Sequence, residues 1–392
     1  MMKKSASRGF LKLLVLSVLG VLVYAFVSTQ TSSNISLQTD RLGPAYSMLM
    51  LDNNIHLDSL EVLSDISEDQ KVYLMNRMRD GVQNVIKKCV ISQHTKQTCD
   101  TYLKDTDKIL TLFTTFDYNK VKFSINNKTL HNWKSLPNVN VIVFTNSVHV
   151  KYYSELAGWQ VLPVTDEVDG IPILPGMFLE AKKKFSTKYY AFANGDLLFT
   201  DSLINTLRTI SCSYDVTSPK GLLIVGRRTN VPAQVISNEN AVNWSSLQHI
   251  SANYGELFQT DAEDYFISDV HYPWDKFLPV IVGRRGYDNW VVAYSRNSNL
   301  SVIDASESVT CLHQTWHEKL MFESLTKGDY NLKLTDQLDL PFSVGDWGHT
   351  VCAHWKSWPD LCGNIVLSRR RTLPKKCLEY KWGHKISKFI FG

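Results

Sequence analysis

The sequence lacks the local signatures of several common enzyme classes. It contains no G-x-x-x-x-G-K-[ST] phosphate loop, no G-x-G-x-x-G dinucleotide turn, no G-x-S-x-G nucleophile elbow and no H-E-x-x-H zinc motif. None of its seven cysteines stands in a C-x-x-C pair, which argues against a zinc or redox site built on cysteine. It also has no internal repeat. These absences argue against phosphate-loop enzymes, dinucleotide-binding enzymes, esterases and zinc proteases of the familiar kinds.

Net charge is absent beyond the first residues of the chain. The formal net charge of +4 equals the contribution of Lys3, Lys4, Arg8 and Lys12, and no acid accompanies them. The rest of the 392 residues therefore sums to zero. A nucleic-acid-binding protein usually carries a strongly basic folded face. We therefore predict no nucleic-acid partner.

One long apolar run stands near the start. Gly9 to Val27 is apolar except for Lys12, and it has the length that an α-helix needs to cross a bilayer. The basic residues before it favour a cytosolic tail over residues 1–8 and a signal anchor over 9–27. A signal peptide cleaved near Ala25 or Ser28 is the alternative, although no clean A-x-A site ends the run. The sequence thus predicts a single-pass type II protein of the Golgi or endoplasmic reticulum membrane, with the remaining chain in the lumen.

Two further features suit an oxidising lumen. Seven cysteines allow disulfides, and the close pairs Cys89/Cys99 and Cys352/Cys362 are the expected local bridges. The odd number leaves at least one cysteine unpaired or bonded to another chain. Four sequons offer glycan acceptors, at Asn34, Asn127, Asn243 and Asn299.

Changes in composition divide the chain into segments. We expect a stem over 28–66, an N-terminal helical appendage over 67–107, a catalytic-type domain over 108–320 and a C-terminal extension with a basic tail over 321–392. The appendage is predicted from a Ser-x-x-Gln capping box at Ser67 and apolar residues at helical spacing. The basic tail includes Arg369–Arg371, and we expect it to be solvated or docked on the domain, with an anionic partner as the alternative.

From Lys108 onward, short apolar runs alternate with stretches of helical length. The runs are rich in β-branched and aromatic residues, as buried strands are, and they begin near Lys108, Asn140, Trp159, Lys188 and Gly221. Such alternation predicts an α/β fold with a mostly parallel sheet flanked by helices. Ligands of such sheets bind beyond the carboxyl ends of the strands, so catalytic and ligand-binding residues are expected just after each run.

The sharpest candidate follows the run that begins at Lys188. The sequence YYAFANGDLLF leads from apolar residues into the turn-forming triplet Asn194-Gly195-Asp196. A carboxylate at this edge could bind Mg²⁺ or Mn²⁺, which prefer oxygen ligands. The plainer interpretation is that Asp196 only caps a turn.

This segment resembles the strand that carries the Asp-x-Asp motif of GT-A glycosyltransferases, and the resemblance extends over about residues 108–313. It implies a GT-A-like fold in which Asp196 binds the metal ion and the nucleotide-sugar diphosphate. Asn194 stands where the family has its first acid, so the resemblance makes it a neutral contact to ribose or to metal-bound water. The implied cofactor is Mn²⁺ or Mg²⁺.

Two later segments match further parts of that family. Asp288 in Gly286-Tyr-Asp-Asn-Trp lies at the expected start of a helix, where the resemblance implies a general base; a carboxylate that stabilises the helix dipole is the alternative. His313 follows the strand-like run SVIDASESVTCL and resembles the family's C-terminal metal ligand. A structural or solvated histidine is the alternative.

Other residues are weaker candidates. Arg227 and Arg228, and likewise Arg284 and Arg285, follow strand-like runs, and guanidinium groups suit phosphates. Exposed charge is the alternative for each pair. The acidic stretch 261–264 is either an acceptor site or, as the more ordinary interpretation, a solvated loop. Three tryptophans suit either sugar stacking or a core, namely Trp244, Trp274 and Trp290.

Together these residues predict transfer of a sugar from a nucleotide-sugar donor to a hydroxyl of a glycan or glycoprotein. Two alternatives remain open. One is a non-catalytic GT-A-fold protein that binds sugars or acts as a scaffold, which the missing first carboxylate favours. The other is a lumenal phosphotransferase or nucleotidyltransferase, which also needs a metal ion and arginines.

Overall fold

The computed structural model describes residues 108–116, 119, 122–213, 221–315, 327–338, 344–360 and 362–377. The predicted cytosolic tail 1–8, anchor 9–27, stem 28–66 and appendage 67–107 lie outside these residues, as do Asn34, Cys89 and Cys99. Within the described ranges, no helix is both long enough and apolar enough to span a bilayer. The elements described below belong to one compact unit, apart from the short turn Pro359–Asn364.

A nine-stranded, mostly parallel sheet forms the centre of this unit, in the order β15-β14-β12-β8-β11-β6-β1-β2-β3. Within it, β11 runs antiparallel to its neighbours β6 and β8. Its strands are β1 (Leu110–Thr114), β2 (Val139–Phe144), β3 (Gln160–Leu162), β6 (Tyr189–Ala193), β8 (Leu222–Arg227), β11 (Glu263–Asp269), β12 (Ser301–Asp304), β14 (Trp355–Pro359) and β15 (Ile365–Arg369). The expected α/β class with a mostly parallel sheet is confirmed, and all five predicted apolar runs form strands of it.

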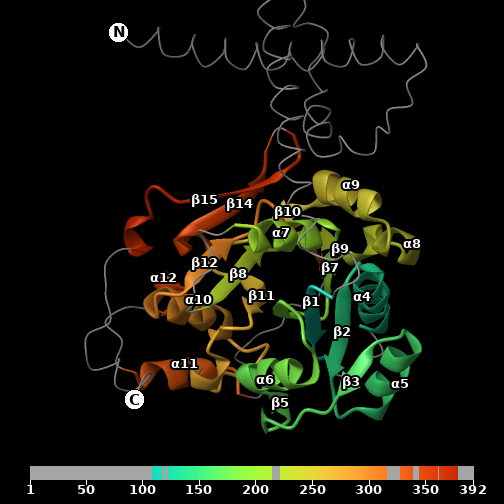
Figure 1. Ribbon diagram of the computed structural model, residues 1–392. Helices are drawn as coiled ribbons and strands as arrows, with labels where there is room; N and C mark the ends of the chain where they lie inside the picture. The colour runs from blue at the N-terminus through green and yellow to red at the C-terminus, as the bar shows by residue number, and fades with distance from the viewer. Residues whose placement is uncertain are drawn as a thin grey trace, which may run out of the picture. The chain divides into compact units, whose positions relative to one another are not determined.

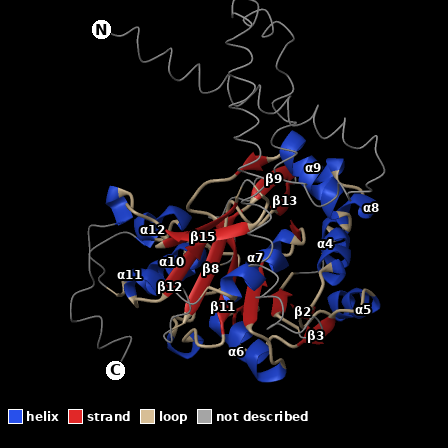
Figure 2. Cartoon of the chain, turned by 45° about the horizontal axis from the view of Figure 1, so that its top comes forward, coloured by secondary structure: helices blue, strands red, loops and turns tan. Residues whose placement is uncertain are grey.

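Helices cover both faces of the sheet, as Figures 1 and 2 show. The helices α4 and α7 pack on one face, and α6 and α10 pack on the other. Their bounds are α4 (Phe123–Ser135), α5 (Val148–Leu156), α6 (Leu174–Lys184), α7 (Ser202–Ser211) and α10 (Tyr287–Asn297). In α6, Pro175 lies at the start of the helix, where its missing N–H costs no hydrogen bond.

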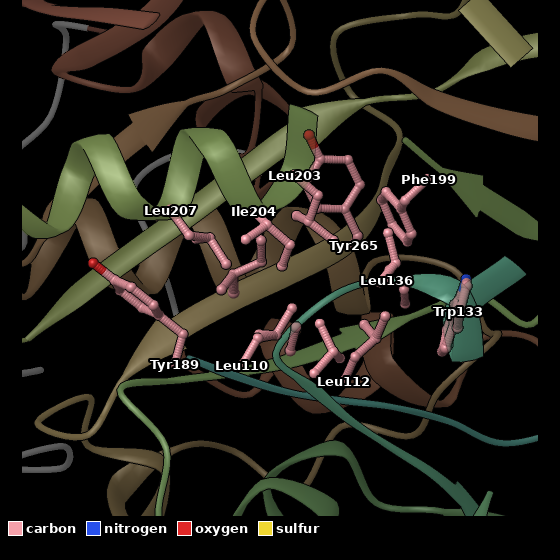
Figure 3. Close-up of a cluster of buried hydrophobic side chains, with 14 of the residues drawn as sticks. Leu110, Leu112, Trp133, Leu136, Tyr189, Phe199, Leu203, Ile204, Leu207 and Tyr265 are labelled. Carbon is pink, nitrogen blue, oxygen red and sulfur yellow. The ribbon is translucent and has the colours of Figure 1, made fainter. Parts of the chain in front are cut away.

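The strands are apolar throughout because both of their faces are covered. Successive side chains of a strand point to opposite faces. Leu110 and Leu112 of β1 therefore lie in one buried cluster with Ile204 and Leu207 of α7 (Figure 3). Phe113, the residue after Leu112, points to the opposite face and packs against Phe178 of α6, with ring centroids 4.8 Å apart. Because both faces of the strand are buried, the sequence shows a continuous hydrophobic run and no alternation of apolar and polar residues.

A second, smaller sheet has the order β10-β9-β13-β7. Its elements and the helices beside it are β7 (Leu197–Phe199), β9 (Thr229–Pro232), β10 (Glu256–Leu257), β13 (Cys311–Thr315), α8 (Asn238–Ala241) and α9 (Trp244–Tyr254). The chain crosses from the large sheet into the small one three times, from β6 to β7 through Asn194-Gly195-Asp196, from β8 to β9 through Arg228, and from β12 to β13 through residues 305–310. The sequence did not predict this sheet, yet its junction with the large sheet is where the candidate residues lie.

Shorter elements complete the unit. They are β4 (Glu167–Val168), β5 (Ile171–Pro172), η3 (Ala233–Val235), η4 (Trp274–Lys276), α11 (Tyr330–Asp336), α12 (Val344–Trp347), η6 (Thr350–Cys352) and η7 (Lys375–Cys377). The strands β14 and β15 come from the segment assigned to the C-terminal extension, and they lengthen the large sheet. Arg370, in the predicted basic tail, forms an ion pair with Asp304 at the end of β12, so this part of the tail docks on the domain.

The predicted Cys352–Cys362 bridge is wrong. Cys352 bonds to Cys377, with their Cα atoms 5.4 Å apart, and this bond joins η6 to η7. Cys212 and Cys362 are each disulfide-bonded as well. Among the described cysteines Cys311 is free, and it is buried in β13. Closeness along the chain suggested the wrong partner because a disulfide depends on Cα separation in space, which the packing of η6 and η7 sets.

Candidate active site

The Asn194-Gly195-Asp196 turn is held in place by backbone contacts. Asn194 N–H donates to the Asp264 carbonyl at 3.0 Å, which extends the β6–β11 pairing into the turn. A Cβ added at Gly195 would lie 2.8 Å from the Phe116 ring, so a side chain there would force a shift. The Asp196 carbonyl accepts the backbone N–H of Gln314 at 3.2 Å. The turn therefore presents Asp196 from a fixed backbone.

Asp196 and His313 face each other across the small sheet. His313 pairs with Leu197 in the β13–β7 ladder, and its Nε2 lies 3.3 Å from Asp196 Oδ2. The sequence placed His313 after a strand, but the structure places it inside β13. This difference matters because the strand pairing sets its distance from Asp196. We call these two residues the Asp196 pair.

The other nitrogen of His313 contacts Asn230. The Asn230 Oδ1 atom accepts from Arg228 Nε at 2.9 Å, so this atom faces His313 Nδ1, at 3.1 Å, as an acceptor. His313 Nδ1 must then carry the proton of that hydrogen bond. In the protonated ring, Nε2–H donates to the Asp196 carboxylate, whereas in the neutral ring the Nε2 lone pair faces the carboxylate and could bind a cation with it.

The charges around Asp196 favour its ionised form. Burial raises the pKa of the Asp196 carboxyl, but His313, Arg228 and Lys122 together outweigh burial, and the pKa lies below its ordinary value. The Asp196 side chain is 35% exposed and that of His313 is 17% exposed. Asp196 is therefore a carboxylate that remains accessible.

A divalent cation fits between the two side chains of the Asp196 pair. Ligand atoms lie about 2.1 Å from such an ion, so two ligands at right angles lie about 3 Å apart. The observed Oδ2–Nε2 distance of 3.3 Å is close to this value. Asp196 Oδ1 is buried and has no hydrogen-bond partner in the described part of the chain.

The protein supplies few ligands to such an ion. In the described ranges, no three His, Cys, Asp and Glu side chains converge in the manner of a metal site. The chain would therefore offer two ligands and leave the others to phosphate oxygens and water, which is common for Mg²⁺.

Asp264 connects this pair to the large sheet. Its Oδ1 atom accepts from Asn194 Nδ2 and from Arg228 Nη1, each at 2.7 Å. Its side chain is only 8% exposed, and Glu263 is fully buried beside it in β11. The solvated-loop interpretation is therefore wrong for these two acids, because the β-bulge between Glu263 and Tyr265 turns them into the sheet.

The two arginine pairs differ in what they contact. Arg228 is held by Asp264, by Asn230 and by the Phe258 ring, whose centroid lies 4.2 Å from the guanidinium carbon. The Arg227 side chain instead donates to the Phe258 carbonyl at 2.6 Å. Arg284 Nη1 donates to the Gly283 carbonyl, and Arg285 is exposed. Arg228 is thus the arginine of these four that forms an ion pair with Asp264.

Asp288 lies in the first turn of α10, as predicted. Gly286 precedes the helix with φ of 83°, a left-handed conformation that suits glycine. Asn289 anchors this helix start, because its Nδ2 donates to the carbonyls of Asp261 and Gly348 at 3.0 and 2.9 Å. Tyr287 OH donates to Asn194 Oδ1 at 3.2 Å. The start of α10 is therefore bonded to the same turn that carries Asp196.

Asp288 and Glu263 form a second acidic region, which we call the Asp288 group. Burial raises the pKa of Asp288 to about 7, and the negative charge of Asp264 adds to the shift. Burial also raises the pKa of Glu263 well above its ordinary value, and the charge of Asp288 adds to it. Both carboxyl oxygens of Glu263 lack a hydrogen-bond partner among the described residues. Burial therefore favours the protonated form of both carboxyl groups.

Sequence reasoning missed several residues at this site, namely Lys122, Asn230, Tyr287 and Gln314. Gln314 Nε2 donates to the Asp196 carbonyl at 3.3 Å, and Lys122 is a further cation that acts on Asp196. Gln314 follows His313 directly, so alternation in β13 was the only signal for it. Two of the three tryptophans, Trp274 and Trp290, are buried in the core and do not present a face for sugar stacking.

Comparisons with known proteins give a likeness of fold only. The chain matches no protein-family model and no curated protein. Among solved structures it is similar to glucosyl-3-phosphoglycerate synthase from Mycobacterium tuberculosis in complex with Mn²⁺, UDP-glucose and phosphoglyceric acid. The two are 10% identical over 60% of this chain and 82% of that chain, with a TM-score of 0.36.

A second similar structure is a mannosyltransferase from Pyrobaculum calidifontis in complex with GDP-mannose and Mn²⁺. It is 10% identical over 58% of this chain and 65% of that chain, with a TM-score of 0.34. Both similar proteins are nucleotide-sugar glycosyltransferases. At this degree of likeness, the function of the present chain has to be argued from its own residues.

Proposed function

We propose that this chain is a metal-dependent glycosyltransferase that moves a sugar from a nucleotide-sugar donor to a hydroxyl of a glycan or glycoprotein. The observation that carries the proposal is the Asp196 pair, in which a carboxylate and an imidazole lie 3.3 Å apart at the junction of two sheets. A bonded path runs from this junction to the start of α10, where Asp288 lies. One site therefore combines ligands for a cation with a separate candidate base.

On the donor side, Asp196 and His313 would hold Mn²⁺ or Mg²⁺. When bound, the ion neutralises the charge that develops on the diphosphate leaving group. The lowered pKa of Asp196 keeps this ligand ionised at neutral pH. Arg228 and Lys122 bring further positive charge to the same region, which favours an anionic donor.

On the acceptor side, Asp288 is the proposed base. An alcohol attacks more readily when a carboxylate within hydrogen-bond reach accepts its proton. A pKa of about 7 suits this role, because the group is partly ionised at neutral pH and still basic enough to take a proton. The raised pKa of Glu263 favours its protonated form, in which it is not a base.

The cellular setting is also a proposal. The apolar run Gly9–Val27 and the basic residues before it support a type II anchor in a Golgi or endoplasmic reticulum membrane, with the domain in the lumen. The disulfide Cys352–Cys377 is consistent with an oxidising compartment. Substrates would then be glycans or glycoproteins that pass through the secretory pathway.

A donor screen on the purified full chain tests the function. UDP- and GDP-sugars would be incubated with and without Mn²⁺, and released nucleotide would be scored. We expect release with one donor class, and we expect a chelator to abolish it. Absence of release with every donor would contradict the proposal. Transfer of phosphate rather than sugar to the acceptor would favour a phosphotransferase.

A further inference from the structure

Asn194 occupies the place of the family's first acid, yet the structure shows that its side chain is already in use. Its Nδ2 donates to Asp264 Oδ1 at 2.7 Å, and its Oδ1 accepts from Tyr287 OH at 3.2 Å. Both ends of the amide therefore bind protein groups. These two contacts fix the orientation of the Asn194 side chain.

Asp264, unlike Asn194, has one side-chain oxygen without a hydrogen-bond partner among the described residues. Its Oδ1 atom accepts two hydrogen bonds, from Asn194 and from Arg228, and these fix the orientation of the carboxyl group. Its Oδ2 atom is buried and has no hydrogen-bond partner among the residues that the structure describes. A buried polar atom without a partner destabilises the fold. Such an atom, oriented by two strong contacts, is a ready acceptor for a ligand group.

The chemistry of that ligand group follows from the surroundings. A carboxylate oxygen next to ionised Asp196 repels phosphate, so the group must be a hydrogen-bond donor or a cation. In the described ranges, no third acidic or histidine side chain joins Asp196 and His313 at a metal site, which argues against a shared cation. The hydroxyl groups of a nucleotide sugar are donors that lie near its diphosphate.

We propose that Asp264 binds a hydroxyl group of the nucleotide-sugar donor through Oδ2, and so replaces the carboxylate that position 194 lacks. This inference rests on the proposed function. The hydroxyl belongs either to the ribose or to the transferred sugar, because both carry vicinal hydroxyls. Asn194 then acts as a positioning residue that orients Asp264.

Binding calorimetry with Mn²⁺ present tests the proposal. The probes are UDP and GDP, their 2′-deoxy and 3′-deoxy forms, UDP-glucose and GDP-mannose. Asp264→Asn is the informative variant, because an asparagine can keep the acceptor toward Asn194 and Arg228 and replaces Oδ2 with an NH₂ group. Asp261→Asn is the matched control, since it neutralises an exposed acid three residues earlier. Thermal unfolding checks that both variants fold.

The two sources of the hydroxyl predict different results. If it is on the ribose, Asp264→Asn weakens binding of the nucleoside diphosphate about 10- to 100-fold, and one deoxy form loses a similar factor on the wild-type chain but none on the variant. If it is on the transferred sugar, binding of the nucleoside diphosphate is unchanged, and only the nucleotide sugar is weakened. Asp261→Asn should behave as the wild type in both cases.

Three outcomes would overturn the inference. The first is unchanged binding of every probe by Asp264→Asn. The second is an equal loss for all probes, deoxy forms included, which would mean that Asp264 acts only through Asn194 or the metal ion. The third, which does not depend on a folded variant, is a wild-type chain that discriminates against no deoxy form and binds nucleotide sugars no better than nucleoside diphosphates. Failure of the wild-type chain to bind any probe with Mn²⁺ would instead overturn the proposed function.

A reciprocal variant sharpens the test. Asn194→Asp restores the acidic triplet in the sequence, but it places two carboxylate oxygens at the 2.7 Å separation now occupied by a hydrogen bond. We expect binding of the preferred probe to weaken about ten-fold or more, because like charges at this distance repel. Tighter binding by Asn194→Asp would show that Asp264 has not taken over the role.

Discussion

Asp196 and Asp288 are carboxylates of one site, yet the chain gives them opposite properties. Asp196 lies between His313, Arg228 and Lys122, and its pKa falls below the ordinary value although burial opposes this. Asp288 has acidic neighbours, and burial with the charge of Asp264 raises its pKa to about 7. Asp264 lies between them, bonded to Arg228 on one side and acting on Asp288 by its charge on the other.

The difference indicates two roles. A carboxylate with a low pKa binds cations across the physiological range but is a poor base, whereas one with a pKa near 7 can accept and release a proton. Placing titratable groups in environments that separate their pKa values is how enzymes assign acid, base and ligand roles. Four experiments test whether Asp196 and Asp288 have these separate roles.

The largest effect is expected for Asp196→Ala. Loss of this ligand should abolish Mn²⁺-dependent turnover, a decrease of about 1,000-fold or more, because the charge on the leaving group is no longer neutralised. Released nucleotide measures the turnover, and circular dichroism should show an unchanged fold. Asp275→Ala, which removes an exposed acid in η4, should retain activity. Normal turnover by Asp196→Ala would refute the assignment.

Asp288→Asn should lower kcat about 100-fold or more while leaving donor binding intact, because the asparagine cannot accept the acceptor's proton. Steady-state kinetics and calorimetry with the nucleotide measure the two properties separately. Equal losses in donor affinity and in kcat would contradict the distinction between the Asp196 pair and the Asp288 group.

The pH dependence should follow Asp288 in both activity and stability. Activity should rise through about pH 7, as the base ionises, and fall about ten-fold per pH unit below it. The pKa of Asp288 is raised from 3.8 in the unfolded chain to about 7 in the folded one, so between these pH values the folded chain binds more protons. Its contribution to stability is present below pH 3.8 and is lost as the pH rises through 7.

A series of kcat/KM values and of urea unfolding curves across this range tests both parts. Asp288→Asn should lose the acid limb of the activity profile, and its stability relative to the wild type should increase with pH. An acid limb near pH 4 in the wild type would show that Asp288 is not the group that titrates.

The smallest effect on turnover is expected for Glu263→Gln. The raised pKa of Glu263 favours its protonated form, so a neutral glutamine of similar shape should leave the acid limb in place. The variant should resist unfolding better than the wild type at alkaline pH, because it cannot carry a buried negative charge. Thermal unfolding at pH 6 and pH 9 measures this. A large shift of the acid limb would mean that Glu263 is ionised in the active enzyme.

Local patterns predicted much of this protein. The apolar runs became strands such as β1 and β6, the helix start at Gly286 placed Asp288 in the first turn of α10, and the Asn194-Gly195-Asp196 turn follows β6. Each of these features depends on residues a few positions apart. Sequence periodicity and turn chemistry carry that information directly.

Tertiary structure alone decided which distant residues meet. The pairing of β13 with β7 brings His313 to Asp196, and the pairing of β11 with β6 brings Asp264 to Asn194. Packing of η6 and η7 likewise gives Cys352 the partner Cys377 rather than Cys362. The sequence by itself determined the carboxylates and their strand and helix ends. The fold decided which of them is surrounded by cations and which by other acids, because a pKa depends on neighbours in space and not on neighbours in the chain.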